Sequence, residues 1–200
     1  MGTGAGTQLY WFIGRGSGIV AYILLTLSIF LGIALSRRWH SPNWPRLIVD
    51  AAHHWLTTTF YVFVGIHTLM MLLDPFAKFN LADVTIPFYS SYRTLWLSLG
   101  IIAAELGLAM GASVFVRRWI GYRTWHILHG LAYPIFAFSL LHAIGTGTDR
   151  GTLWAQALYG GSVILILGAI VWRTERSPRL QAAFVVGSLL LAVTVFHFTA

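Results

Sequence analysis

The chain has 200 residues, of which 57% are hydrophobic and only 10% are charged, and its mean hydropathy is +0.72. Because a soluble domain carries about a quarter charged residues, this composition excludes an ordinary water-soluble protein and indicates an all-α integral membrane protein. The 13 Lys and Arg against 6 Asp and Glu lie between apolar runs, which favours a positive-inside membrane topology over a nucleic-acid partner. The absence of Cys excludes Cys-ligated iron–sulfur clusters and covalent c-type haem.

Six apolar stretches have the length, roughly 20 residues, that crosses about 30 Å of hydrocarbon. In chain order they cover residues 9–36, 47–73, 94–116, 122–145, 153–172 and 180–199. They predict a bundle of about six transmembrane helices. We divide it into a core, residues 1–173, and an additional C-terminal transmembrane helix, residues 174–200.

The charge of the connections alternates along the chain. The connections after the first, third and fifth stretches are basic, with Arg37, Arg38 and Arg46, then Arg117, Arg118 and Arg123, then Arg173, Arg176 and Arg179. The other two are close to neutral, with Asp74, Lys78, Asp83 and Arg93 in one and Asp149 and Arg150 in the other. Basic loops stay in the cytoplasm, so we expect a multi-pass protein of the inner (plasma) membrane with both termini outside.

Histidines concentrate in the second and fourth stretches. Of the eight in the chain, six lie there: His53, His54, His67, His126, His129 and His142. An isolated imidazole in a membrane helix is often structural, forming a hydrogen bond across the bundle. Six in two stretches favour a functional site, because polar side chains inside the bilayer are costly.

The spacing of these histidines predicts two stacked pairs. His53 and His67 are 14 residues apart, which places them about 21 Å apart along a helix and about 40° apart around it. His129 and His142 are 13 apart, or about 20 Å. Both stretches start in the cytoplasm and run parallel, so His53 pairs with His129 near the inside and His67 with His142 near the outside. Two such pairs are what two stacked bis-His haems require.

Two points stay open in this geometry. Thirteen residues of ideal helix turn His129 and His142 about 140° apart, so the pairing needs a kink or a tightened turn, for which Pro134 is a candidate. His54 and His126 are rival ligands. The spacing favours His53 over His54, but it does not choose between His126 and His129.

The run Arg123-Thr-Trp-His-Ile-Leu-His129-Gly-Leu-Ala-Tyr133, followed by His142, resembles the R-x-W-x-x-L-H-x-x-x-Y…H signature of ferric-reductase-like transmembrane domains. That family includes the membrane parts of NADPH oxidases and ferric reductases and the haem-b subunit of a bacterial methionine-sulfoxide reductase system. The resemblance covers roughly residues 9–172. It implies two haem b groups, selects His129 over His126, and implies electron transfer from the cytoplasm to the outside.

The resemblance also implies partners. Oxidases and reductases of the family carry a flavin and NAD(P)H module, which does not follow the membrane part here. We therefore expect electrons to come from a separate donor protein or from quinol and to leave to an external acceptor. Whether the chain is itself an enzyme stays open. The stretch 180–199 is expected to dock a partner membrane subunit.

Further polar and small residues have two interpretations each. Arg15 and Arg93, near the outer ends of their stretches, and Arg123, in the motif, are candidates for binding haem propionates; otherwise they are lipid-facing or topology-determining charges. Gly107 and Gly111 form G-x-x-x-G, which predicts close packing of a neighbouring helix.

Two alternatives to a stand-alone conduit remain. One is a non-redox scaffold or transporter subunit whose histidines bind a metal or carry protons. The other is a haem-bearing accessory subunit of a larger respiratory or photosynthetic complex.

Overall fold

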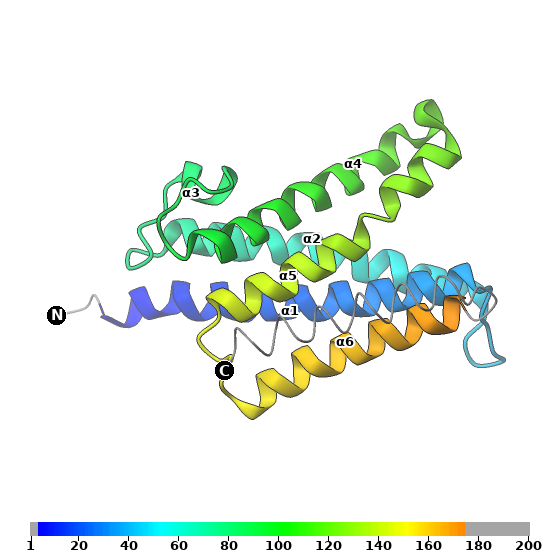
Figure 1. Ribbon diagram of the computed structural model, residues 1–200, viewed down its shortest axis with the longest axis horizontal. Helices are drawn as coiled ribbons and strands as arrows, with labels where there is room; N and C mark the ends of the chain where they lie inside the picture. Colours follow the sequence, from blue (N-terminus) through cyan, green and yellow to red (C-terminus); the bar gives the residue numbers. More distant parts are fainter. Residues whose placement is uncertain (1–3, 175–200) are drawn as a thin grey trace. The chain divides into compact units, whose positions relative to one another are not determined.

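Helices account for the regular structure of the chain in a computed structural model, which describes residues 4–174 (Figure 1). In order they are α1 (Gly4–Ser36), α2 (Arg46–Leu73), α3 (Leu81–Thr85), α4 (Thr94–His129), α5 (Ala132–Thr146) and α6 (Leu153–Thr174). Over these residues there is no β-strand, only an isolated bridge between Ser41 and Trp44. The all-α prediction is confirmed. The predicted sixth stretch, 180–199, lies outside the described residues.

Four helical stretches of the described chain are long and apolar enough to cross a membrane. They are Gln8–Ser36, Arg46–Leu73, Thr94–Thr146 and Leu153–Thr174. Three of them reproduce predicted segments to within a few residues. The multi-pass membrane character of the chain follows from these stretches.

The stretch Thr94–Thr146 folds back on itself. Its 53 residues would be about 80 Å long as one straight helix, far more than the roughly 30 Å of a bilayer core. The backbone breaks at Gly121, with φ 79° and ψ 160°, a conformation that only glycine adopts without strain. Beyond the break the chain returns along α4, so that His142 Nδ1 lies 2.9 Å from the carbonyl oxygen of Trp96 (Figure 1). The stretch therefore turns back on itself at Gly121, and its two separate membrane passes stay a prediction.

The break at Gly121 falls within the connection expected at residues 117–121. Arg117 and Arg118 are themselves helical, so the first part of α4 continues a few residues beyond the predicted end of the apolar stretch. Arginine is a good helix former and its long side chain reaches the interface without unwinding the backbone, which explains this extension.

A second interruption separates His129 from His142. Gly130 and Leu131 have φ/ψ near −64°/−15° and −61°/−13°, values typical of a tight 3₁₀ turn. Pro134 has no N–H to give to the carbonyl of Gly130, which accepts from the N–H of Tyr133 instead, at 3.3 Å. The expected departure from an ideal helix between the two histidines is therefore present in the structure.

The described chain forms two compact units. The first joins the start of α1, as far as Tyr22, to residues Phe60–Gly147; among the described residues, the second joins Ile23–Thr59 to residues 148–174. In the first unit, Ile101, Ile135 and Leu140 are buried. In the second, Ile33, Val49 and Ile166 are buried, and the Arg37 guanidinium lies 5.6 Å from the ring centre of Trp172.

The G-x-x-x-G of α4 packs against α2 in the first unit. The Tyr61 hydroxyl donates a 2.8 Å hydrogen bond to the carbonyl of Gly107. A Cβ placed on Gly111 would lie only 2.9 Å from the same hydroxyl oxygen. The two glycines thus accommodate the Tyr61 side chain, and the predicted close packing of a neighbouring helix against them stays a prediction.

Candidate functional site

In the first unit, His67 of α2 and His142 of α5 lie face to edge. Their ring centres are 6.2 Å apart and their ring planes make an angle of 82°. His67 Nδ1 lies 2.7 Å from the carbonyl oxygen of Gly14, and His142 Nδ1 lies 2.9 Å from that of Trp96. Each ring is therefore held by a main-chain oxygen of a neighbouring helix, α1 for His67 and α4 for His142.

These contacts determine which ring nitrogen carries the proton. A carbonyl oxygen can only accept, so Nδ1 of each imidazole must be the N–H donor. In a neutral ring the lone pair is then on Nε2. Metal-ligating histidines almost always donate their second N–H to a carbonyl or carboxylate in this way, because it fixes the tautomer and the orientation of the ring. Both histidines thus have the tautomer that a metal ligand needs, and their role as ligands stays a prediction.

The separation of the two ring centres has the length expected for two imidazoles that share one metal ion. Two metal–imidazole bonds of about 2 Å, with about 1 Å from each nitrogen to its ring centre, give about 6 Å between ring centres. Across the described residues, no group of three or more His, Cys, Asp and Glu side chains is placed to hold a metal ion. Two axial imidazoles suit an iron whose other ligands belong to a cofactor, as in a haem.

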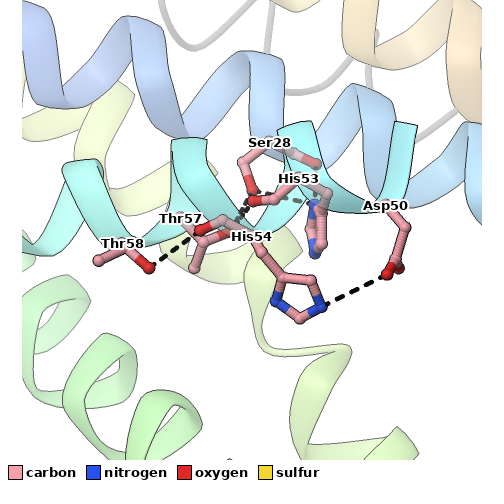
Figure 2. Close-up of polar contacts among 6 residues, drawn as sticks. All are labelled: Ser28, Asp50, His53, His54, Thr57 and Thr58. Carbon is pink, nitrogen blue, oxygen red and sulfur yellow. Dashed lines mark hydrogen bonds and ion pairs between the residues drawn. The ribbon is translucent and has the colours of Figure 1, made fainter. Parts of the chain in front are cut away.

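In the second unit, His53 of α2 has the same arrangement (Figure 2). Its Nδ1 lies 2.9 Å from the carbonyl oxygen of Ser28 on α1 and 3.2 Å from the hydroxyl of that residue. The Ser28 hydroxyl lies 2.7 Å from that of Thr57, which itself donates to the carbonyl of His53 at 2.8 Å. His53 is therefore also an Nδ1–H donor whose lone pair lies on Nε2.

The rival His54 is placed differently. Its side chain is exposed, and its Nε2 lies 3.8 Å from a carboxylate oxygen of Asp50, one turn earlier on α2 (Figure 2). The nitrogen that would bind a metal thus faces a carboxylate. This agrees with the preference of the spacing for His53 over His54.

The histidines of the sequence motif lie after the Gly121 break. His129 is half-buried and stacks on Trp125, with ring centres 5.0 Å apart, whereas His126 is exposed and stacks on Tyr122 at 5.8 Å. His53 belongs to the second unit and His129 to the first, and their pairing stays a prediction.

The three candidate arginines have distinct surroundings. The Arg15 guanidinium lies 5.1 Å from the ring centre of Trp11, and Arg93 donates from Nη1 to the carbonyl of Gly145, three residues after His142. Arg123 is exposed. Contacts of these side chains with haem propionates stay predictions.

Sequence reasoning missed the groups that hold the rings. The acceptors are the main-chain oxygens of Gly14, Ser28 and Trp96, and the rings lie against Gly18, Gly32 and Gly100. One signal was available: Gly18 and Gly32 are 14 residues apart, the same spacing as His53 and His67. Because α1 and α2 carry the glycines and the histidines at the same spacing, His67 can lie against Gly18 and His53 against Gly32.

Comparison with known proteins identifies the family of the chain. The family described as "Ferric reductase like transmembrane component" matches residues 17–140, which is more than half of the chain. The chain belongs to this family. No curated protein and no solved structure matches it. The matched region contains His53, His67 and His129 and ends two residues before His142. Membership indicates a membrane electron-transfer component.

Proposed function

We propose that the chain is a cytochrome b subunit that conducts electrons across the inner (plasma) membrane through two bis-His haem b groups. Electrons enter from a separate donor protein or from quinol and leave to an external acceptor. The observation that carries the proposal is the pair His67 and His142, whose ring separation suits one iron and whose Nδ1 atoms both meet main-chain carbonyls.

The bound haems would supply one-electron chemistry at iron. In the outer site, the protein would hold the haem iron through Nε2 of His67 and Nε2 of His142. The carbonyls of Gly14 and Trp96 hold Nδ1–H and so increase the electron density at Nε2. A more basic ligand stabilises the oxidised iron and lowers its reduction potential, which is a means of tuning the flow of electrons.

The inner haem is assigned to His53 and His129. The Nδ1 contact of His53 with the Ser28 carbonyl has the same chemistry as the outer contacts, and His129 occupies the histidine of the family motif. The basic connections expected on this side would suit an acidic surface on a donor protein. Arg123 for the inner haem, and Arg15 and Arg93 for the outer one, are assigned to the propionates.

Absorption spectroscopy of the purified full chain tests the proposal. After expression with ample haem, the reduced-minus-oxidised spectrum is expected to show b-type bands, and haem extraction to give two haems per chain. His67→Ala and His142→Ala should each leave one haem, while the control His54→Ala should keep both. A chain that contains no haem, or that binds iron without porphyrin, would rule the proposal out.

A further inference from the structure

Three histidine rings sit against three glycines in the same relative position. His67 meets the Gly14 carbonyl and lies on Gly18; His142 meets the Trp96 carbonyl and lies on Gly100. In the second unit, His53 meets the Ser28 carbonyl and lies on Gly32. In each case the glycine comes four residues after the residue whose carbonyl accepts the bond. We call this arrangement of a carbonyl and a glycine one turn later a notch.

Helix geometry explains the spacing of four. In an α-helix the carbonyl of residue i already accepts from the N–H of residue i+4. Its second lone pair is open to another donor only from the side, over the backbone of residue i+4. A side chain at that position would block the approach, so a ring that is to bond this oxygen needs a glycine there.

The space at the three notches is not equal. A Cβ added to Gly100 would overlap the His142 ring, with Cε1 and Cγ only 2.7 Å away. At Gly18 the Cβ would be 2.9 Å from Nδ1 of His67, and at Gly32 it would be 3.3 Å from Cε1 of His53. An alanine therefore displaces the ring most at Gly100, less at Gly18 and least at Gly32.

We propose that Gly18, Gly32 and Gly100 are positioning residues for the haem-ligating histidines: each leaves the space through which an imidazole Nδ1–H reaches a main-chain carbonyl, and so sets the plane and tautomer of the ligand. The inference rests on the proposed function, since the rings must be haem ligands.

The chain provides two matched controls. Gly16 lies on α1 between two notch residues and has open space around the position of its Cβ, so Gly16→Ala tests a helix change without a clash. Gly111 lies in a fourth notch, occupied by the Tyr61 hydroxyl bonded to the Gly107 carbonyl. Gly111→Ala therefore makes a clash of the same kind, 2.9 Å from the hydroxyl oxygen, against a side chain that is not a ligand.

The experiment compares haem content, electron paramagnetic resonance and midpoint potentials of the holoprotein for Gly100→Ala, Gly18→Ala, Gly32→Ala and the two controls. We expect Gly100→Ala to lose the outer haem or weaken its binding by about 10- to 100-fold, as does removal of a second partner from a metal ligand. Gly18→Ala should keep the outer haem with altered g values and a raised potential. Gly32→Ala should show the smallest shift, confined to the inner haem. Gly16→Ala and Gly111→Ala should keep wild-type g values.

Each outcome is decisive. If Gly100→Ala loses both haems, the milder Gly18→Ala decides, and wild-type g values and potential in that variant overturn the inference. Equal shifts in Gly111→Ala and Gly18→Ala also overturn it, because packing alone would then explain both. A wild-type chain that binds no haem contradicts the proposed function instead, and so the two failures are distinguishable.

Discussion

The rings of His67 and His142 stand nearly perpendicular, at 82°, with their centres 6.2 Å apart. Each ring is held in its orientation by a carbonyl of a different helix, that of Gly14 on α1 for His67 and that of Trp96 on α4 for His142.

Crossed axial ligands predict a distinctive magnetic signature. Perpendicular imidazole planes leave the two iron orbitals that they overlap nearly equal in energy, which gives a strongly anisotropic low-spin ferric signal. We expect such a signal from the outer haem in low-temperature electron paramagnetic resonance of the oxidised protein. It should disappear in His142→Ala and persist in His54→Ala. An outer haem with the moderate anisotropy of parallel imidazoles would contradict the geometry at this pair.

Replacing His53 and His54 of α2 one at a time should show which of the two binds the inner haem. His53→Ala is expected to reduce two haems per chain to one, because it removes Nε2 from the inner site. His54→Ala should keep two, because its ring is exposed and faces Asp50. Quantitative haem extraction measures both. Loss of the inner haem in His54→Ala, with retention in His53→Ala, would show that the ligand is misassigned.

Arg93 should influence the potential of the outer haem. Its guanidinium bonds the Gly145 carbonyl just beyond His142, and its positive charge favours the reduced iron. Arg93→Gln is therefore expected to lower the outer midpoint potential by tens of mV, on the order of 1 kcal/mol. Potentiometric titration followed in the visible bands measures the shift. Arg150→Gln, which removes an exposed arginine from the connection after α5, serves as control and should leave the potential in place.

We expect the fold to require glycine at position 121 because of its backbone conformation and not because a side chain there would clash. Nothing lies within 4 Å of a Cβ built there, yet its φ of 79° and ψ of 160° are unfavourable for any other residue. Gly121→Ala is expected to cost about 1–3 kcal/mol. At about 2–4 °C per kcal/mol for a chain of this size, thermal denaturation should detect the loss. Gly160→Ala, in open space and without positive φ, should melt like the wild type.

Hydropathy located the four apolar helical stretches of the described chain, because it depends on side chains that the sequence records. The preference of the spacing for His53 over His54 as a ligand stays a prediction. The sequence did not reveal that the backbone stays helical through Arg117 and Arg118 as far as Gly121, since arginines near an interface are compatible with helix and loop. The left-handed φ of Gly121 is equally invisible in the sequence, where a glycine is compatible with many conformations.

The carbonyls that orient the histidine rings could not be predicted from the sequence, for a different reason. Gly14, Ser28 and Trp96 share no side-chain property, because the group that each of them contributes in common is the carbonyl oxygen; only Ser28 adds a side-chain contact, through its hydroxyl. The glycines that admit the rings were visible, but glycine is common in membrane helices and gives no sign of what approaches it. Only the contacts between helices connect them to the histidines.

Orientation of a ligand by a main-chain oxygen distributes evolutionary constraint unevenly along a helix. Every amino acid supplies a main-chain carbonyl, so the bonds to the rings at positions 14, 28 and 96 do not require one particular side chain there. The constraint lies instead one helical turn later, at positions 18, 32 and 100, where an added methyl group would come close to the histidine ring. Among relatives, we therefore expect glycine to be conserved at positions 18, 32 and 100 more strongly than the residues at positions 14, 28 and 96, which supply the carbonyls.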